Sequence, residues 1–354
     1  MGRVSAVGMV CVLLVMVAAP GAPARAQAVV RSGAQSSGAQ SPSAKSSGAQ
    51  SSGAQSNVQT AAQPNDVGRV IATGGLIFVQ DPAIAVDQQD VAIAIGEIKV
   101  TYVLRNTTAG ERTILAAFPL PELDSAAGSE QPIRLSAPQT ANFVSAAVTV
   151  DGTPVQPEFE RRALALGLDV TALLAAHQVP LQPFDPATSA YIKRMPRATR
   201  LDFLQRGIVR QEDDRTEPNW ALRTTAFWRQ AFPPRKQVSI VLSYRSITAT
   251  APYQPSLLEA VRPTHCLDAA AEAAITRKLA AKGNTVAFTW SSFVPGSASS
   301  LIGPIRNFRL RLEKPSFDSV VVTCRSGFRP LGPTTFEWAA QNYQEEDLHV
   351  LFID

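Results

Sequence analysis

Alternation of apolar and polar side chains is the strongest pattern in this chain, and it is clearest near the middle. Mostly apolar residues occupy every second position over residues 222–232 and, after two prolines, over residues 238–244. A two-residue period is typical of a half-buried β-strand. We therefore predict a central β-hairpin within residues 217–250, with Trp228 and Tyr244 on its buried face.

Similar alternation predicts a β-rich N-terminal lobe over residues 65–160. Apolar residues alternate over residues 98–104 and return over residues 114–118, which predicts a hairpin around the polar turn between them. The return strand should end in the FPLP sequence, because proline lacks the N–H donor that a sheet needs. Asp151-Gly152 between two apolar runs is a strong signal for a further hairpin.

Two segments show a helical period of three to four residues instead. In the first, residues 161–216, the pair Asp185-Pro186 offers a cap followed by proline at the first helical position. In the second, residues 251–283, Asp268 can cap an alanine-rich helix. We predict one helical insertion in each segment.

Short strands return in a C-terminal β lobe, residues 284–354, where apolar runs are separated by residues that favour turns. The chain therefore contains eight or more short strands, with its helices gathered in two insertions. This order predicts an α+β protein, mainly β, built from antiparallel β-sandwich-like lobes. It does not fit alternating βαβ units.

The first 26 residues have the composition of a secretory signal peptide. Arg3 precedes an apolar run of 13 residues, and small residues around Arg25 form a cleavage pattern. The run is shorter than the roughly 20 residues of a spanning helix. We expect cleavage after Ala26, no transmembrane helix in the mature chain, and a periplasmic or secreted location in the envelope.

Residues 27–64 are dominated by a repeated SGAQS pentapeptide that lacks large apolar side chains. A segment that cannot bury apolar surface cannot offset the entropy lost on ordering. We therefore expect a disordered tether. Attachment to an envelope polymer and glycosylation are the alternatives to a plain spacer.

Composition and charge exclude one class of partner. With 354 residues, of which 45% are hydrophobic, the chain can bury a large core. The formal charge of +4 includes Arg3 and Arg25 of the expected leader, so the mature chain carries about +2. Nucleic-acid binding requires basic residues clustered on one face, whereas the arginines here are scattered along the chain. We expect no nucleic-acid partner.

Two cysteines, Cys266 and Cys324, remain once the expected leader is removed. An even number of cysteines in an exported protein indicates a disulfide bridge. Closing the loop between them would stabilise the chain by roughly 4 kcal/mol through the entropy of the unfolded state. Two buried free thiols are the alternative.

Catalytic motifs are absent from the sequence, which contains no nucleophile elbow, phosphate-binding loop or dinucleotide-binding glycine pattern. His177, His265 and His349 stand far apart along the chain and lack the spacing of a helical zinc pair. We therefore assign no catalytic, cofactor-binding or metal-binding residue. A hydrolase that uses Glu158 and Glu160 is one alternative, because the two carboxylates share one face of a strand.

Aromatic side chains suggest another alternative. Trp220 and Trp228 lie in the predicted central hairpin, and the chain has four tryptophans in all. An indole ring can stack on a sugar, and it can equally fill a core. Carbohydrate or cell-wall binding through exposed Trp220 and Trp228 is therefore an alternative to core packing.

Eight motifs occur in an order that resembles a known family. They are ATGGLIF, YVLRNTT, FPLPE, VDGTPVQP, GLDVTALL, WALRTTAFWRQAFP, HCLDAA and IGPIRNFRLRLEK, and they span roughly residues 65–354. In this order they resemble the exported bacterial proteins of domain of unknown function 4424. The resemblance implies an envelope location and a bridge between Cys266 and Cys324, and it implies no activity. The strand YVLRNTT with FPLPE is also similar to a vault-type extracellular β domain, which implies a β-sandwich interaction module.

These observations predict an exported bacterial envelope protein that acts as a non-catalytic structural or interaction module. The expected partner is an envelope protein or a glycan. Carbohydrate binding and hydrolysis are the two alternatives.

Overall fold

The computed structural model describes residues 73–78, 81–125, 135–282, 285–294, 304–344 and 347–354. The expected signal peptide, the expected tether and the first residues of the expected N-terminal lobe lie outside the described residues. Among the described residues, no helix has the length and apolar character needed to cross a membrane.

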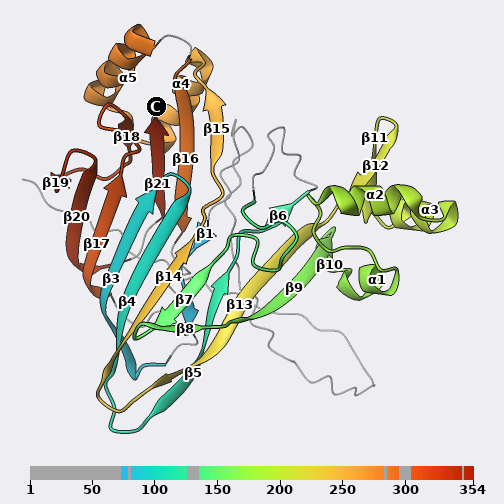
Figure 1. Ribbon diagram of the computed structural model, residues 1–354, viewed down its shortest axis with the longest axis horizontal. Coiled ribbons are helices and arrows are strands. Elements are labelled where there is room, and N and C mark those ends of the chain that lie inside the picture. The colour runs from blue at the N-terminus through green and yellow to red at the C-terminus, as the bar shows by residue number, and fades with distance from the viewer. Residues whose placement is uncertain (1–72, 79–80, 126–134, 283–284, 295–303, 345–346) are drawn as a thin grey trace, which may run out of the picture. The chain divides into compact units, whose positions relative to one another are not determined.

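Three larger sheets and one two-stranded ribbon contain the strands of the described chain (Figure 1). The eight-stranded sheet has the order β19 (Arg329–Pro330), β20 (Thr335–Tyr343), β17 (Ile305–Glu313), β3 (Ile84–Ala94), β4 (Glu97–Asn106), β14 (Gln237–Tyr244), β7 (Ala147–Val150) and β8 (Thr153–Val155). The six-stranded sheet has the order β10 (Leu168–Asp169), β9 (Glu158–Ala165), β13 (Ala221–Phe232), β5 (Arg112–Pro119) and β2 (Ile77–Phe78), with β6 (Leu123–Asp124) paired to β13.

The five-stranded sheet has the order β1 (Thr73–Gly74), β16 (Ala287–Val294), β21 (Leu348–Ile353) and β18 (Val320–Val322), with β15 (Ala249–Pro252) paired to β16. The ribbon consists of β11 (Val209–Glu212) and β12 (Arg215–Pro218). The helices are α1 (Thr171–Ala176), α2 (Pro186–Arg194), α3 (Arg197–Gln205), α4 (Pro255–Thr264) and α5 (Ala269–Lys282).

Most strand pairs are antiparallel, and the helices fall into two insertions, so the predicted α+β, mainly β class is confirmed. The β17–β3 and β1–β16 pairs are parallel. Further predicted details are also confirmed. Strand β5 ends at Pro119, and Asp151-Gly152 forms the turn between β7 and β8 with positive φ at both residues.

The pairing of the two main hairpins was predicted wrongly. Strand β13 pairs with β5 and β9, whereas β14 pairs with β4 and β7, so β13 and β14 belong to different sheets. Likewise β4 and β5 are consecutive but unpaired. The two-residue period identifies a strand and its buried face, but it does not identify the neighbouring strand.

A corner shared by both connections explains this topology. The side chain of Asn106 is fully buried and donates hydrogen bonds to the carbonyl oxygens of Gly110 and Phe232, at 2.8 and 2.9 Å. Its backbone N–H donates to the carbonyl of Lys236 at 3.1 Å. Pro233 and the residue after it lack N–H donors and cannot extend a ladder. Both connections between the two sheets, β4 to β5 and β13 to β14, therefore pass through this corner.

The main core lies between these two sheets. Trp228 of β13 and Tyr244 of β14 expose only 7% and 2% of their surface, so the prediction that they face inward is confirmed. The Tyr244 ring packs on Phe118 of β5 with the ring centroids 5.1 Å apart. Burial raises the pKa of the Tyr244 hydroxyl well above its usual value.

The five-stranded sheet packs one face on the main core and the other on α4 and α5. Phe293 and Phe352 belong to the main core, whereas Trp290 and Leu351 belong to a smaller core that also contains Ile275 of α5. As predicted, Asp268 caps α5, accepting a hydrogen bond from Ala271 N at 2.7 Å.

A disulfide joins Cys266, just before α5, to Cys324, just after β18. The predicted bridge is therefore present, with an S–S distance of 2.04 Å. Both cysteines are exposed. Within α5, the ammonium group of Lys278 is buried and lies 3.1 Å from Asp318 Oδ2. The bridge and this ion pair both attach α5 to the sheet.

Candidate functional site: the helical arm

Residues 166–218 form a structure that we call the helical arm. It contains β10, the helices α1, α2 and α3, and the ribbon β11–β12, and it lies beyond the ends of β9 and β13 (Figure 1). Its core is separate from the main core and consists of Ala163, Ala165, Leu174, Val179, Ile192, Met195, Phe203, Ile208, Val209 and Trp220. The arm is thus an independently packed insertion in the β structure.

The arm begins later than the sequence suggested. A helical insertion was predicted from residue 161, but β9 continues to Ala165 and pairs with β13 in the register Ala221↔Leu164 to Phe227↔Glu158. The spacing of apolar residues is ambiguous at this point. The arm packs on the end of β9, so consecutive residues on both faces of the strand are apolar.

Local sequence signals fix the ends of the arm helices. Asp185 caps α2 by accepting a hydrogen bond from Ala187 N at 2.9 Å, and Pro186 occupies the first helical position, as predicted. Pro196 separates α2 from α3. The chain leaves α3 through Gly207, whose φ of +67° is in the left-handed region that glycine adopts without strain.

Trp220 closes the base of the arm core. Its side chain is fully buried, and its indole Nε1 donates to the carbonyl oxygen of Leu181 at 2.9 Å. Trp228 is buried in the main core and donates from Nε1 to Gln230 Oε1 at 3.1 Å. Neither ring is available for stacking, so the expectation of a carbohydrate site on exposed Trp220 and Trp228 is wrong. Both indoles fill cores and satisfy their N–H groups internally.

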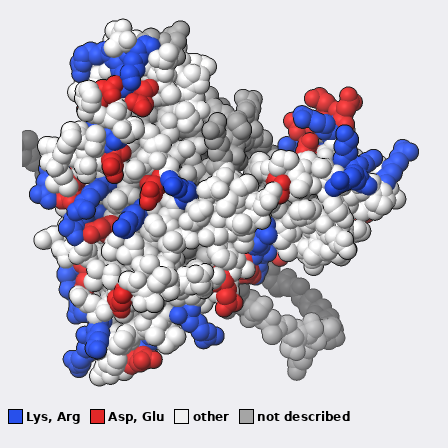
Figure 2. Space-filling view, viewed as in Figure 1, with Lys and Arg blue, Asp and Glu red and all other residues white. Residues whose placement is uncertain are grey.

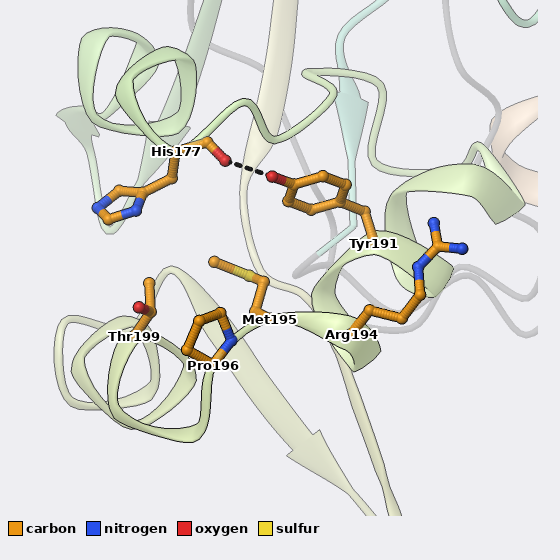
Figure 3. Close-up of a pocket in the computed structure, with 6 residues that line it drawn as sticks. All are labelled: His177, Tyr191, Arg194, Met195, Pro196 and Thr199. Atoms are coloured by element: carbon orange, nitrogen blue, oxygen red, sulfur yellow. Dashed lines mark hydrogen bonds between the residues drawn. The ribbon is translucent and has the colours of Figure 1, made fainter.

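A pocket of about 290 Å³ opens on the arm between α1, α2 and α3. Figure 3 shows the His177 imidazole on one side of the opening and the Tyr191 ring on the other. The pocket is lined by His177, Tyr191, Arg194, Met195, Pro196 and Thr199. The Tyr191 hydroxyl donates to the His177 carbonyl oxygen at 2.8 Å, which ties α2 to the end of α1.

The chemistry of this pocket suits binding. An imidazole, a hydroxyl and a guanidinium offer hydrogen-bond donors and one fixed positive charge, and the Met195 thioether supplies an apolar wall. The lining contains no carboxylate and no thiol. It therefore lacks the acid and base pair of a hydrolase, and a single histidine does not make a metal centre.

Exposed leucines are concentrated on the arm. Eight large hydrophobic residues are exposed in the described chain, and four of them lie between residues 166 and 204. We call these four the leucine patch, and their exposed fractions are 76% for Leu166, 70% for Leu168, 47% for Leu201 and 38% for Leu204. Large apolar side chains that remain this exposed mark an interaction surface when they are contiguous.

The charges of the arm differ from those of the eight-stranded sheet. On the sheet, Arg105 is bidentate on the buried Asp87, and Arg309 pairs with Asp90 at 2.8 Å. The Arg105 guanidinium lowers the pKa of Asp87. In Figure 2, the arm shows Lys and Arg over α2 and α3, with Asp and Glu gathered over β11–β12. Within the described residues, the one ion pair of α2 and α3 joins Arg206 to Asp202.

The carboxylates considered for hydrolysis lie elsewhere. Glu158 and Glu160 occupy the same face of β9 and are both exposed. Glu160 is engaged by the guanidinium of Arg162. Neither carboxylate lines the arm pocket, so nothing in their surroundings favours the hydrolase alternative.

Two histidines that are distant in sequence meet in the fold. His265 at the end of α4 and His349 of β21 have ring centroids 6.4 Å apart, while His177 lies on the arm. His349 Nδ1 lies 2.9 Å from the hydroxyl of Ser292. The described residues contain no group of three or more side chains arranged to hold a metal ion. Desolvation, with a contribution from His349, lowers the pKa of His265 to about 4.

The buried His265 predicts a loss of stability in acid. The pKa of its imidazole is lowered from the usual 6.5 to about 4 in the folded chain, so between these values only the unfolded chain binds the proton. The free energy of unfolding should therefore decrease as the pH falls from 6.5 to 4, by about 3 kcal/mol from this residue. Urea unfolding of wild type and H265Q at pH 7, 5.5 and 4 measures this. Equal pH dependence in both proteins would contradict it.

Sequence reasoning missed the leucine patch and the pocket. A signal was present in Leu166-Gly167-Leu168. The residue before glycine in a two-residue turn is normally asparagine, aspartate or glycine, and here it is leucine. The sequence contains no comparable signal for the pocket. Its residues come from three helices, and the spacing of apolar residues does not specify how these helices pack together.

No curated protein matches this chain. A crystal structure from Legionella pneumophila, described as that of a candidate nutrient-binding protein, is similar with a TM-score of 0.37 and 13% identity, covering 79% of this chain and 70% of that one. A likeness at this level carries no functional argument. Residues 64–351 match the family model described as domain of unknown function (DUF4424), and the chain belongs to this family.

Proposed function

We propose that the protein is a non-catalytic binding module of the bacterial envelope and that the helical arm contacts its partner. The single observation that carries this proposal is the leucine patch, where four exposed leucines lie on one independently packed insertion. These side chains remain in water in the folded chain, and a partner that covers them gains the free energy of burying their apolar surface.

Support for the location comes from the leader and the bridge. The N-terminal sequence has the pattern of a secretory signal peptide, and a disulfide exposed on the surface persists in an oxidising compartment. An envelope location therefore agrees with both features.

Support for binding rather than catalysis comes from the side chains on the arm. The pocket offers donors and a positive charge, and its lining has no acid, thiol or paired base. These groups can bind a ligand. They do not include a nucleophile beside a base that would activate it, which covalent catalysis requires.

Capture from envelope fractions tests this proposal. The immobilised chain is exposed to membrane, peptidoglycan and soluble fractions of the envelope, and the retained material is measured for wild type and for L201S/L204S. Both leucines are exposed, so the substitutions should leave the arm core intact. We expect retention to fall at least tenfold, because two apolar contacts are removed from the patch.

Leu331 is the matched control, since it is 48% exposed and lies outside the arm. The L331S variant should retain as much envelope material as wild type does. Equal retention by wild type and L201S/L204S would refute the arm as the contact surface. Retention of peptidoglycan alone, lost in L201S/L204S, would identify the partner as a glycan.

A further inference from the structure

The leucine patch has features that identify the class of its partner. Resting on the proposed function of the arm, we infer that the patch inserts into the surface of an anionic lipid bilayer, such as one that contains phosphatidylglycerol. Three independent observations carry this inference: an exposed leucine in an unfavourable backbone conformation, the contact of this leucine with the end of α3, and the net positive charge of residues 193–206.

Leu166 occupies the turn between β9 and β10 at a φ of +51° and is 76% exposed. The left-handed conformation disfavours leucine, and burial does not compensate for it here. Among the described residues, Leu166 is the one large aliphatic residue with positive φ. Asparagine before Gly167 would suit this turn better. Both the left-handed backbone conformation and the exposure to water are unfavourable for a leucine. Its presence here indicates a contact that the isolated chain does not make.

The turn that carries Leu166 lies against the C-terminal end of α3. A Cβ atom placed on Gly207 would lie 2.7 Å from Leu166 Cδ1, so the Leu166 side chain rests on the residue that follows the C-cap of α3. Gly207 N in turn donates to the Leu204 carbonyl oxygen at 3.1 Å. Leu201 is three residues before Leu204 and shares its helix face. Leu166 therefore lies beside the C-terminal end of α3, the helix that carries the exposed Leu201 and Leu204.

Positive charge borders this surface. Residues 193–206 contain Lys193, Arg194, Arg197, Arg200 and Arg206 and a single carboxylate, Asp202, which gives this stretch a net charge of +4. Asp202 is occupied by Arg206. Arg197 precedes Leu201 by four residues and so lies on the same face of α3. Aliphatic side chains flanked by cations are the pattern of a surface that enters the interface of an anionic membrane.

A bilayer fits this patch better than a protein partner does. Energetically dominant contacts between proteins are rich in tryptophan, tyrosine and arginine and poor in leucine. All four residues of the patch are leucines, and the two on the turn expose 70% or more of their surface, so they stand out rather than line a groove. Protruding aliphatic residues insert among acyl chains without needing a matching pocket.

Vesicle binding tests the inference. The chain, purified in the form that export leaves, is mixed with vesicles of phosphatidylcholine and phosphatidylglycerol (about 7:3) or of phosphatidylcholine alone, and the bound fraction is measured by flotation. We expect binding to the anionic vesicles, weakened by salt because the cations are exposed. L166N/L168T should weaken it at least tenfold. R197Q and R200Q should each weaken it about fivefold.

Matched variants keep the result interpretable. Because asparagine suits the turn, L166N/L168T should unfold at or above the temperature of wild type, which separates lost binding from lost fold. L331S and R277Q, both on exposed residues outside the arm, should bind like wild type. Since every variant has the same N-terminal segment, any binding through that segment cancels in the comparison.

Two results would overturn the inference. One is binding of L166N/L168T within twofold of wild type, and the other is no binding of wild type to anionic vesicles. If vesicles are not bound but L201S/L204S still loses an envelope protein or glycan in the capture experiment, the bilayer is excluded and the arm remains the contact surface. If the leucine substitutions change neither vesicle binding nor capture from envelope fractions, the proposed function fails as well.

Discussion

Replacing Trp220 with alanine is expected to lower the free energy of unfolding by about 3–5 kcal/mol. Trp220 is fully buried at the base of the arm, where it packs against residues from β9, α2, α3 and β11. Truncation removes a large apolar surface and leaves a cavity that the surrounding helices cannot fill. It also leaves the carbonyl oxygen of Leu181 without its indole donor. Urea unfolding followed by circular dichroism measures the change.

Two further variants separate these effects. Trp220→Phe keeps much of the apolar volume but lacks the N–H group, so it should cost less than alanine. Trp338 of β20 is only partly buried, and Trp338→Ala should also cost less than Trp220→Ala. Because the arm core is separate from the main core, Trp220→Ala should reduce partner capture even under conditions in which the sheets remain folded. A change in unfolding free energy below about 1 kcal/mol would contradict the arm core described here.

Removing the disulfide with C266S/C324S is expected to lower the free energy of unfolding by about 4 kcal/mol. The two cysteines are separated by 58 residues, and opening this loop returns conformational entropy to the unfolded chain. The loss should be largest for α5, since the bridge lies directly before it. Hydrogen exchange on α5 compared with β13 measures this distribution.

Exposure of the bridge allows a second measurement on the unmodified chain. Both cysteines are exposed, so a reductant should open the bridge without prior unfolding of the sheets. The reduced chain should then match C266S/C324S in stability, because the two share the same open loop. Equal stability of oxidised chain, reduced chain and variant would show that the bridge does not constrain the unfolded state.

The hydrophobic pattern predicted the strands better than their partners. The alternation around Trp228 and Tyr244 correctly identified two strands and their buried faces. It could not show that the two prolines between them mark a corner between sheets. That corner depends on the buried amide of Asn106, whose partners Gly110 and Phe232 are 4 and 126 residues away in the sequence. Contacts at such a separation leave no periodic signal in one sequence.

Helix ends were predictable where a side chain caps them. Asp185 and Asp268 both accept the hydrogen bonds expected of them. Helix α4 was not predicted within residues 251–283, because no side chain caps it and a proline lies inside it. It forms because Leu257 and Val261 pack against the five-stranded sheet in the smaller core. Tertiary packing thus overrides a weak local preference.

The candidate site could be predicted only in part. The tryptophans drew attention because their rings suit ligands as well as cores, and only the fold shows that Trp220 and Trp228 are buried. The sequence does not show which leucines are exposed, since helical spacing alone does not say which face is covered. Leu166 was the exception, because its place before Gly167 in a tight turn conflicts with the residues that such turns favour.

Site-specific photo-crosslinking in cells tests the arm most directly. A photoreactive amino acid replaces Leu201 on α3 in one chain and Ser239 on the outer face of β14 in another, and adducts with envelope components are compared. The account predicts adducts from position 201, with lipid among them, and few from position 239. Adducts from position 239 with none from position 201 would place the partner on the eight-stranded sheet and contradict the account.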